Sequence, residues 1–170
     1  MSKLKILCIC ILLFVMLACE NKSKTVFLEK DGTLYEITDQ ASFYYPNRLS
    51  IDTSSDNVDA VHFIDDDEIM TYFSLMDDTD NLIEDMPDLY QGQLEEEGAS
   101  DVSYRSITLD SGLECYKFYG KYSSSGMKFE HVVFFTTECT YALTYQASET
   151  VYDENIEEIN QYLESLTVHY

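Results

Sequence analysis

The fold is decided by residues 102–147, which read VSYRSITLDSGLECYKFYGKYSSSGMKFEHVVFFTTECTYALTYQA. Four segments rich in aromatic and β-branched residues make up this stretch, at 102–109, 113–122, 128–136 and 139–147. Short pieces with turn chemistry separate them: Asp110-Ser-Gly112, Ser123-Ser-Ser-Gly126 and Thr137-Glu138. We therefore predict four consecutive strands in an antiparallel meander.

The chain before this stretch also carries strand patterns. We predict strands over residues 25–29, 33–37, 41–46, 49–53, 58–64 and 69–75. The first two flank Lys30-Asp31-Gly32, and an Asp-Gly pair between such segments predicts a tight hairpin.

Two helices complete the plan. The first has apolar residues at helical spacing, at Leu82, Ile83, Met86, Leu89, Tyr90 and Leu94. Asp80 is its expected cap and Gly98 its expected stop, while Pro87 either kinks it or marks its true start. Asp153 is the expected cap of a closing helix with an apolar stripe at Ile156, Ile159, Leu163 and Leu166. These elements predict an α+β fold, an antiparallel sheet with helices packed on it.

Several motifs occur in a recognisable order along residues 33–168. They are Phe43-Tyr-Tyr-Pro46 before the Leu49-Ser-Ile-Asp52 strand, the helix near 81–97, Ser111-Gly-Leu-Glu-Cys-Tyr116, Tyr141-Ala-Leu-Thr-Tyr-Gln-Ala147 and the closing Ile156…Ile159…Leu163-Glu-Ser-Leu166 helix. Together they resemble the PsbP/Mog1-like α/β/α sandwich seen in small bacterial lipoproteins of unassigned function. The resemblance implies a fold and a non-enzymatic binding or assembly role, and no metal-binding residue of that family maps onto a position here.

The amino terminus predicts export and lipidation. Residues 1–5 are basic, and residues 6–18 form an apolar run shorter than the roughly 20 residues that a membrane-spanning helix needs. Met16-Leu-Ala-Cys19 resembles a lipobox, with Met in place of the usual Leu. We therefore expect a signal peptide at 1–18, a lipid on Cys19 and a membrane-anchored domain facing outside the cytoplasm. An ordinary secretory signal and an uncleaved anchor are the alternatives.

The mature chain is expected to contain a tether at residues 19–24 and one globular domain at 25–170. Removing residues 1–18 takes away Lys3 and Lys5 and no acid, so the formal charge changes from −22 to −24. Such a charge excludes direct binding of nucleic acid or anionic headgroups. The 14 Tyr and 9 Phe exclude a disordered chain.

Runs of carboxylates raise the alternative of a calcium-binding accessory protein. The candidate ligands are Asp65, Asp66, Asp67, Asp77, Asp78 and Asp80. Calcium takes six to eight oxygens, which adjacent aspartates can partly supply. The runs lack the spacing and glycine of an EF-hand, and a solvated acidic surface explains them equally well.

Two cysteines remain after Cys8, Cys10 and Cys19 are accounted for by the signal peptide and the lipid. If Tyr122 pairs with Met127 and residue 136 with Cys139, then Cys115 and Cys139 lie two strands apart, about 9.5 Å. A disulfide needs Cα atoms within about 7 Å, so we expect free, buried thiols.

The sequence gives little indication of a catalytic site or a cofactor site. His62, His131 and His169 are expected to be structural, because they lie on separate elements and do not converge as zinc ligands would. No Gly-x-Ser-x-Gly motif or phosphate-binding glycine loop occurs, so an envelope hydrolase is the least favoured alternative and no cofactor is expected.

The many tyrosines suggest one further hypothesis, an aromatic binding groove. Among those on predicted strands are Tyr44, Tyr45, Tyr116, Tyr119, Tyr122, Tyr141 and Tyr145. Most are expected to pack in the core, but they could also line an aromatic groove for a peptide or glycan. The function predicted from the sequence is a lipoprotein that binds a protein, peptide or glycan partner or assists assembly.

Overall fold

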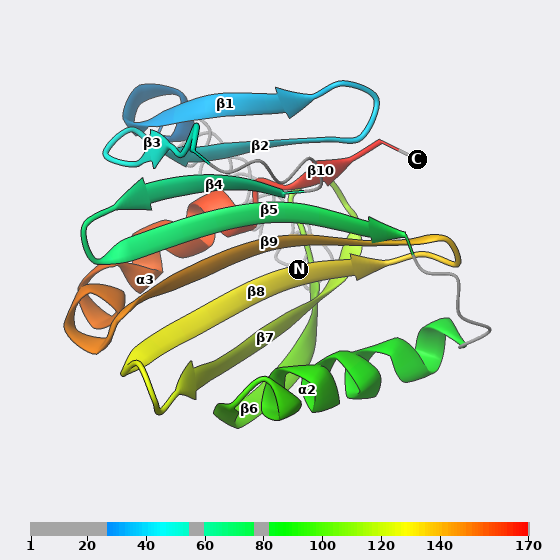
Figure 1. The fold of residues 1–170 in the computed structure, drawn as a ribbon. Coiled ribbons are helices and arrows are strands. Elements are labelled where there is room, and N and C mark those ends of the chain that lie inside the picture. The colour runs from blue at the N-terminus through cyan, green and yellow to red at the C-terminus, as the bar shows by residue number, and fades with distance from the viewer. Residues whose placement is uncertain (1–26, 55–59, 77–81, 170) are drawn as a thin grey trace, which may run out of the picture.

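The computed structural model describes residues 27–54, 60–76 and 82–169 (Figure 1). The expected signal peptide, Cys19 and the tether lie outside these ranges, and so do Asp77, Asp78 and Asp80. Within the described ranges, no helix is both long enough and apolar enough to cross a membrane.

Seven strands form one antiparallel sheet in the order β3-β4-β5-β9-β8-β7-β6. Their bounds are β3 Ser50–Ile51, β4 Ala60–Asp65, β5 Glu68–Met76, β6 Ala99–Thr108, β7 Glu114–Tyr122, β8 Met127–Phe135 and β9 Cys139–Ser148. The predicted meander is confirmed as β6 to β9. The two predicted registers are confirmed as well, because Tyr122 pairs with Met127 and the Thr136 N–H donates to the Cys139 carbonyl.

A smaller sheet contains three strands in the order β1-β2-β10. Their bounds are β1 Gly32–Ile37, β2 Ala41–Pro46 and β10 Thr167–Val168. The predicted hairpin at Lys30-Asp31-Gly32 is wrong: residues 27–31 are helical, and β1 pairs with β2 instead.

Gly32 lies at a close contact with other parts of the chain and does not form a hairpin turn. A Cβ at this position would lie 2.7 Å from Tyr162 Cε1 and 2.9 Å from the Leu28 carbonyl oxygen. Phe27 packs on the ring of Tyr162, and Leu28 is buried in the core. The preceding segment is therefore held by tertiary packing of its apolar residues and does not extend as a strand.

The two predicted helices are present with changed starts. Helix α2 spans Met86–Glu96 after a 3₁₀ turn, η1, at Ile83–Asp85, so Pro87 marks its start and does not kink it. Gly98, at φ 96°, ends it as expected. Helix α3 spans Glu149–Leu163, so the prediction that Asp153 caps it is wrong. Strand β9 runs directly into α3, and Asp153 instead accepts a hydrogen bond from Lys128 Nζ at 2.8 Å.

The two helices lie on opposite faces of the large sheet (Figure 1). Helix α3 packs on β8, β9 and β2, where it closes a core that includes Phe43, Phe63, Tyr145 and Leu163. Helix α2 packs mainly on β6, over a second core that includes Leu94, Phe118, Phe129 and Val133. Helix α2 covers the β6 side of its face, and among the described residues no helix packs on the part of that face over β4 and β5.

Candidate ligand-binding groove

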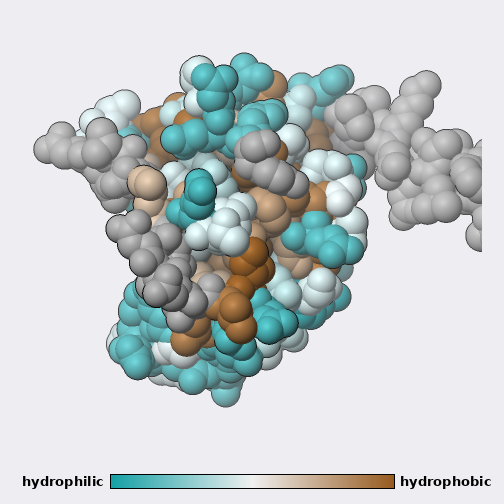
Figure 2. All heavy atoms as spheres, turned by 90° about the vertical axis from the view of Figure 1, so that its right-hand side faces the viewer, coloured by the Kyte–Doolittle hydropathy of each residue, from teal (hydrophilic) through white to brown (hydrophobic). Residues whose placement is uncertain are grey.

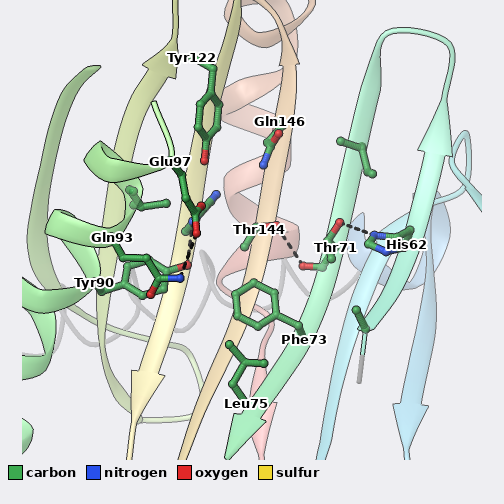
Figure 3. Close-up of a pocket in the computed structure, with 14 residues that line it drawn as sticks. His62, Thr71, Phe73, Leu75, Tyr90, Gln93, Glu97, Tyr122, Thr144 and Gln146 are labelled. Carbon is green, nitrogen blue, oxygen red and sulfur yellow. Dashed lines mark hydrogen bonds between the residues drawn. The ribbon is translucent and has the colours of Figure 1, made fainter. Parts of the chain in front are cut away.

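A cavity of about 450 Å³ lies between α2 and the open part of the sheet. It takes residues from β4, β5, β7, β8, β9 and α2 (Figure 3). Sites for small ligands are commonly concave, largely apolar and a few hundred Å³ in volume, with a small number of polar groups. The size and position of this groove make it the candidate functional site.

Strand β5 supplies the longest wall of the groove. Ile69, Thr71, Phe73 and Leu75 line it, whereas the intervening Met70 and Tyr72 are buried in the core under α3. Side chains of a strand alternate between the two faces of its sheet, so an alternating sequence sets this wall. Phe73 and Leu75 thereby present apolar surface to the groove, across from α2 (Figure 3).

Apolar surface continues out of the groove toward the start of α2. The large apolar side chains there are unusually exposed: Leu75 by 49%, Met76 by 84%, Leu82 by 60% and Ile83 by 43%. Figure 2 shows this side of the molecule, with hydrophobic surface gathered near its centre and lower part. Exposed apolar side chains that gather next to a groove are typical of a binding surface. We call these four residues the apolar rim.

Two residues at the base of the groove form an incomplete polar pair. The Tyr90 hydroxyl of α2 lies 3.0 Å from Nδ1 of His131, which is on β8 and only 4% exposed. Among the residues that the structure describes, Nε2 of His131 has no hydrogen-bond partner. Burial lowers the pKa of His131 to about 3, so the ring is neutral at pH 7. A buried polar nitrogen without a partner is uncommon in folded proteins.

Several other polar groups of the groove have hydrogen-bond partners within the protein. His62 Nδ1 and Thr71 Oγ1 lie 2.9 Å apart across β4 and β5, and Thr144 Oγ1 donates to the Thr71 carbonyl. Gln93 Nε2 donates to Glu97 Oε1 at 3.0 Å (Figure 3). None of the described residues that line the groove is a lysine or arginine. The carboxylate among these lining residues belongs to Glu97. The groove therefore favours neutral or cationic ligand groups.

The acidic run at Asp65, Asp66 and Asp67 forms the turn between β4 and β5. Asp65 Oδ1 accepts the N–H of Asp66, and the Asp67 carbonyl accepts the N–H of Ser148. Across the described part of the chain, no three histidine, cysteine or carboxylate side chains group as metal ligands. The other candidate ligands, Asp77, Asp78 and Asp80, lie outside the described residues.

The adjoining Glu68 has a different environment from the rest of that run. It is buried at the base of α3, where Arg48 and Tyr145 donate hydrogen bonds to it. Burial opposes its ionisation, but these hydrogen bonds lower the pKa of Glu68. Glu68 is therefore part of the structural core and faces away from the groove.

Both remaining cysteines are free thiols. Cys115 on β7 is buried, and Cys139 on β9 is half-buried. Burial raises the pKa of Cys115 to about 12, so its thiol is protonated and poorly nucleophilic at neutral pH.

Most of the tyrosines on strands pack against the two cores, whereas Tyr119 is exposed. Of the seven considered from the sequence, Tyr122 lines the groove, and Tyr145 is buried under α3. Tyr90 lines the groove too, although the sequence indicated only its place on the apolar side of α2. His131 was expected to be a satisfied or exposed structural histidine, and it is instead buried with one nitrogen unpaired. The pairing of Tyr90 with His131 depends on where α2 lies on the sheet. No local pattern in the sequence indicates that position.

No family model matches the sequence, and a comparison with curated proteins finds no match. Comparison with solved structures, in contrast, shows that the chain has the PsbP/Mog1-like α/β/α sandwich fold, as predicted. The fold class, an antiparallel sheet with helices packed on both faces, is likewise confirmed.

Three solved structures illustrate the likeness. Cyanobacterial PsbP from Synechocystis sp. PCC 6803 has 17% identity and a TM-score of 0.58, with 81% of this chain and 92% of that chain covered. The Saccharomyces cerevisiae Ran-binding protein Mog1p has 11% identity and a TM-score of 0.54, with coverage of 81% and 95%. A Pseudomonas aeruginosa protein of unknown function, described as a putative regulator, has 12% identity and a TM-score of 0.50, with coverage of 80% and 96%. At these identities the likeness concerns the fold alone.

Proposed function

We propose that this chain is a lipid-anchored protein on the outer side of a bacterial membrane, whose single domain binds a partner and catalyses no reaction. The observation that carries the proposal is the groove between α2 and the open sheet face, which continues into the apolar rim. The lipobox-like Met16-Leu-Ala-Cys19 supports the anchor.

The chemistry of the groove favours binding over catalysis. Nucleophilic catalysis needs a hydroxyl or thiol beside a base that a third group orients. Neither serine nor cysteine occurs among the described residues that line the groove. His131 is held neutral by burial, and Thr71, which does contact a histidine, is a cross-strand partner of His62 in an ordinary strand pair.

The fold is also compatible with a protein partner. Mog1p, which shares this fold, is a Ran-binding protein. A protein or peptide partner is therefore our first choice for this chain, ahead of a glycan. The anchor would keep the acidic domain close to partners at the membrane surface, while its charge keeps the domain soluble.

The anchor is tested by the Cys19→Ala variant in the native cells, followed by membrane fractionation and mass measurement. We expect the variant to leave the membrane or to keep its signal peptide, because the acylated thiol is gone. Unchanged membrane retention together with unchanged mass would refute lipidation.

Binding through the groove is tested by photo-crosslinking in intact cells. A photoreactive amino acid at Leu75, in the apolar rim, is expected to give a discrete adduct. The same amino acid at Glu154, which is exposed on α3 at the other face of the sheet, is the matched control and is expected to give none. Equal adducts from the two positions, or adducts from Glu154 alone, would argue against the groove as the binding face.

A further inference from the structure

We propose that residues 103–108, at the outer edge of β6, accept an extended strand of a partner protein that carries one carboxylate opposite Arg105. We call these six residues the open edge. The inference goes beyond the proposed function, because none of them lines the groove. Two observations carry it: unpaired backbone groups along the open edge, and an arginine in its middle that has no counter-charge within the described structure.

The open edge lies where the large sheet ends. Strand β6 pairs with β7 on one side, and no strand of the described structure pairs with its other side. In an antiparallel pair, every second residue of an edge strand directs its N–H and C=O away from the sheet. The N–H of Leu109 donates to the Leu113 carbonyl, which fixes the phase of this alternation. The residues that face away from β7 are therefore Tyr104, Ser106 and Thr108.

These three residues present a row of backbone donors and acceptors to solvent. None of the six groups has a hydrogen-bond partner among the described residues. Such a row is a template for a further strand. When a strand is added in this way, main-chain hydrogen bonds supply affinity, and the neighbouring side chains supply specificity.

The first half of β6 is closed to such pairing. A bulge lies between Ser100 and Ser103, where Asp101 has a φ of 55°. The Val102 carbonyl accepts a hydrogen bond from Gln91 Nε2 of α2 at 3.2 Å. Bulges and covering elements protect edges from unwanted partners. The protection ends where the open edge begins.

Arg105 lies in the middle of the open edge and is exposed. Among the described residues, it forms neither an ion pair nor a side-chain hydrogen bond. Every other lysine or arginine that the structure describes pairs with a carboxylate, namely Lys30, Arg48, Lys117, Lys121 and Lys128. In a chain with 32 acidic residues, this exception points to a carboxylate supplied by a partner.

The cross-strand neighbour of Arg105 is another cation. Lys117 lies directly opposite on β7, and its Nζ is 3.1 Å from Glu130 and 3.0 Å from Glu164. Like charges that face each other across a sheet are unfavourable. A carboxylate brought beside Arg105 would offset this repulsion.

The geometry specifies the partner strand further. Toward an added antiparallel strand, Arg105 occupies a non-hydrogen-bonded position, where facing Cα atoms are about 4.5 Å apart. A facing glutamate can therefore reach the guanidinium. The rest of the strand is expected to be neutral, because a mature chain of formal charge −24 repels a polyanion. A second copy fits poorly, because its own open edge holds no carboxylate and it carries the same net charge.

Three fluorescent, acetylated and amidated heptapeptides are the probes. In each, threonine and valine alternate around a central residue, which is glutamate, glutamine or lysine. Anisotropy measures their binding to the full chain in phosphatidylcholine nanodiscs, with empty nanodiscs as background. We expect the glutamate peptide to bind most tightly and the lysine peptide least, with steps of about threefold to fivefold.

Charge reversal at the open edge tests the assignment of Arg105. In Arg105→Glu the order of the three peptides should be reversed, which a merely structural role would not produce. Lys121→Glu is the matched control, because Lys121 is an exposed cation on β7 that pairs with Asp101. It should leave the order unchanged. Circular dichroism checks that both variants are folded.

Hydrogen exchange tests the backbone pairing. The glutamate peptide should slow amide exchange in residues 103–108 and leave β1, the edge of the small sheet, unchanged. Ser106→Pro removes an N–H that faces away from β7 and should abolish binding.

Equal affinities of the three peptides, an unreversed order in Arg105→Glu, or protection outside residues 103–108 would overturn this inference. Failure of all three peptides to bind would overturn it too and leave Arg105 as a charge that guards the edge. Dimers that are lost in Ser106→Pro would make a second copy the occupant, which also contradicts the inference. None of these results bears on the Leu75 adduct, which tests the groove separately.

Discussion

The Tyr90 hydroxyl lies 3.0 Å from Nδ1 of His131 and ties α2 to the centre of the large sheet, while Nε2 of the same ring has no partner within the described structure. A hydrogen bond between two buried side chains stabilises a fold by about 1 kcal/mol, but an unpaired buried donor costs about 1–3 kcal/mol. This arrangement is therefore poor for stability.

Removing both members of the pair should not destabilise the protein. In the Tyr90→Phe/His131→Phe double variant, rings of similar shape replace the polar groups, and we expect the free energy of unfolding to stay equal or to rise by about 1 kcal/mol. Tyr90→Phe alone leaves Nδ1 unpaired and should lower it by about 1–3 kcal/mol. Urea unfolding of the variants checks this order, which would be reversed if both ring nitrogens had partners.

The stability of the protein should depend on pH through His131. Its pKa is lowered to about 3 in the folded state, whereas an unfolded histidine has a pKa near 6.5. As the pH falls below 6.5 the unfolded chain takes up a proton that the folded chain does not. The free energy of unfolding should therefore fall, by at most about 1.4 kcal/mol per pH unit from this group. Urea unfolding between pH 7 and pH 5 should show this slope in the native protein and a shallower one in the double variant.

Lys117 should be far more important for stability than Lys128. Lys117 is 1% exposed, and its Nζ lies 3.1 Å from Glu130 Oε1 and 2.6 Å from Asn160 Oδ1 under α3. Lys117→Met leaves the Glu130 carboxylate buried without its counter-charge and should cost about 3–5 kcal/mol.

Lys128→Met is the matched control, because Lys128 pairs with Asp153 at the surface. Its effect should be much smaller, since exposed ion pairs are screened by solvent. Similar losses of unfolding free energy in the two variants would contradict the assignment of Lys117 to a buried network.

Two glycines should respond in opposite ways to substitution by alanine. A Cβ at Gly120 on β7 would lie 2.8 Å from Phe129 Cζ, and Phe129 is fully buried, so Gly120→Ala should destabilise the fold by about 1–3 kcal/mol. Nothing lies within 4 Å of a Cβ at Gly92, in the middle of α2. Gly92→Ala should therefore stabilise the protein by about 0.5–1 kcal/mol. Thermal unfolding of both variants measures the difference in sign.

Calcium should raise the melting temperature no more than magnesium does at equal ionic strength. The Asp65 carboxylate is occupied by the N–H of Asp66, and the turn from Asp65 to Asp67 does not gather ligands. Both salts are expected to act only by screening the net negative charge. A larger shift with calcium, abolished by Asp77→Asn/Asp78→Asn, would instead favour the accessory role in calcium binding.

The sequence by itself determined the large-scale plan of this protein. The meander β6 to β9 and the registers of its last two hairpins followed from alternating side chains and from short turns. In turns such as Ser123–Gly126 the residue types themselves favour turn geometry. The α+β class and the end of α2 at Gly98 followed in the same way, whereas the sequence left open whether Pro87 kinks this helix or starts it. All of these depend on interactions between residues a few positions apart, which sequence patterns record directly.

Tertiary structure alone decided the rest. Residues 27–31 are helical and pack through Phe27 on Tyr162, a residue near the far end of the chain, whose ring Gly32 approaches closely. The groove exists because α2 covers the β6 side of the sheet face and leaves the side over β4 and β5 open, which no local pattern specifies. His131 meets Tyr90 for the same reason. Such contacts join residues distant in sequence, and their free energy comes from packing, so they are defined only once the helices and strands are assembled.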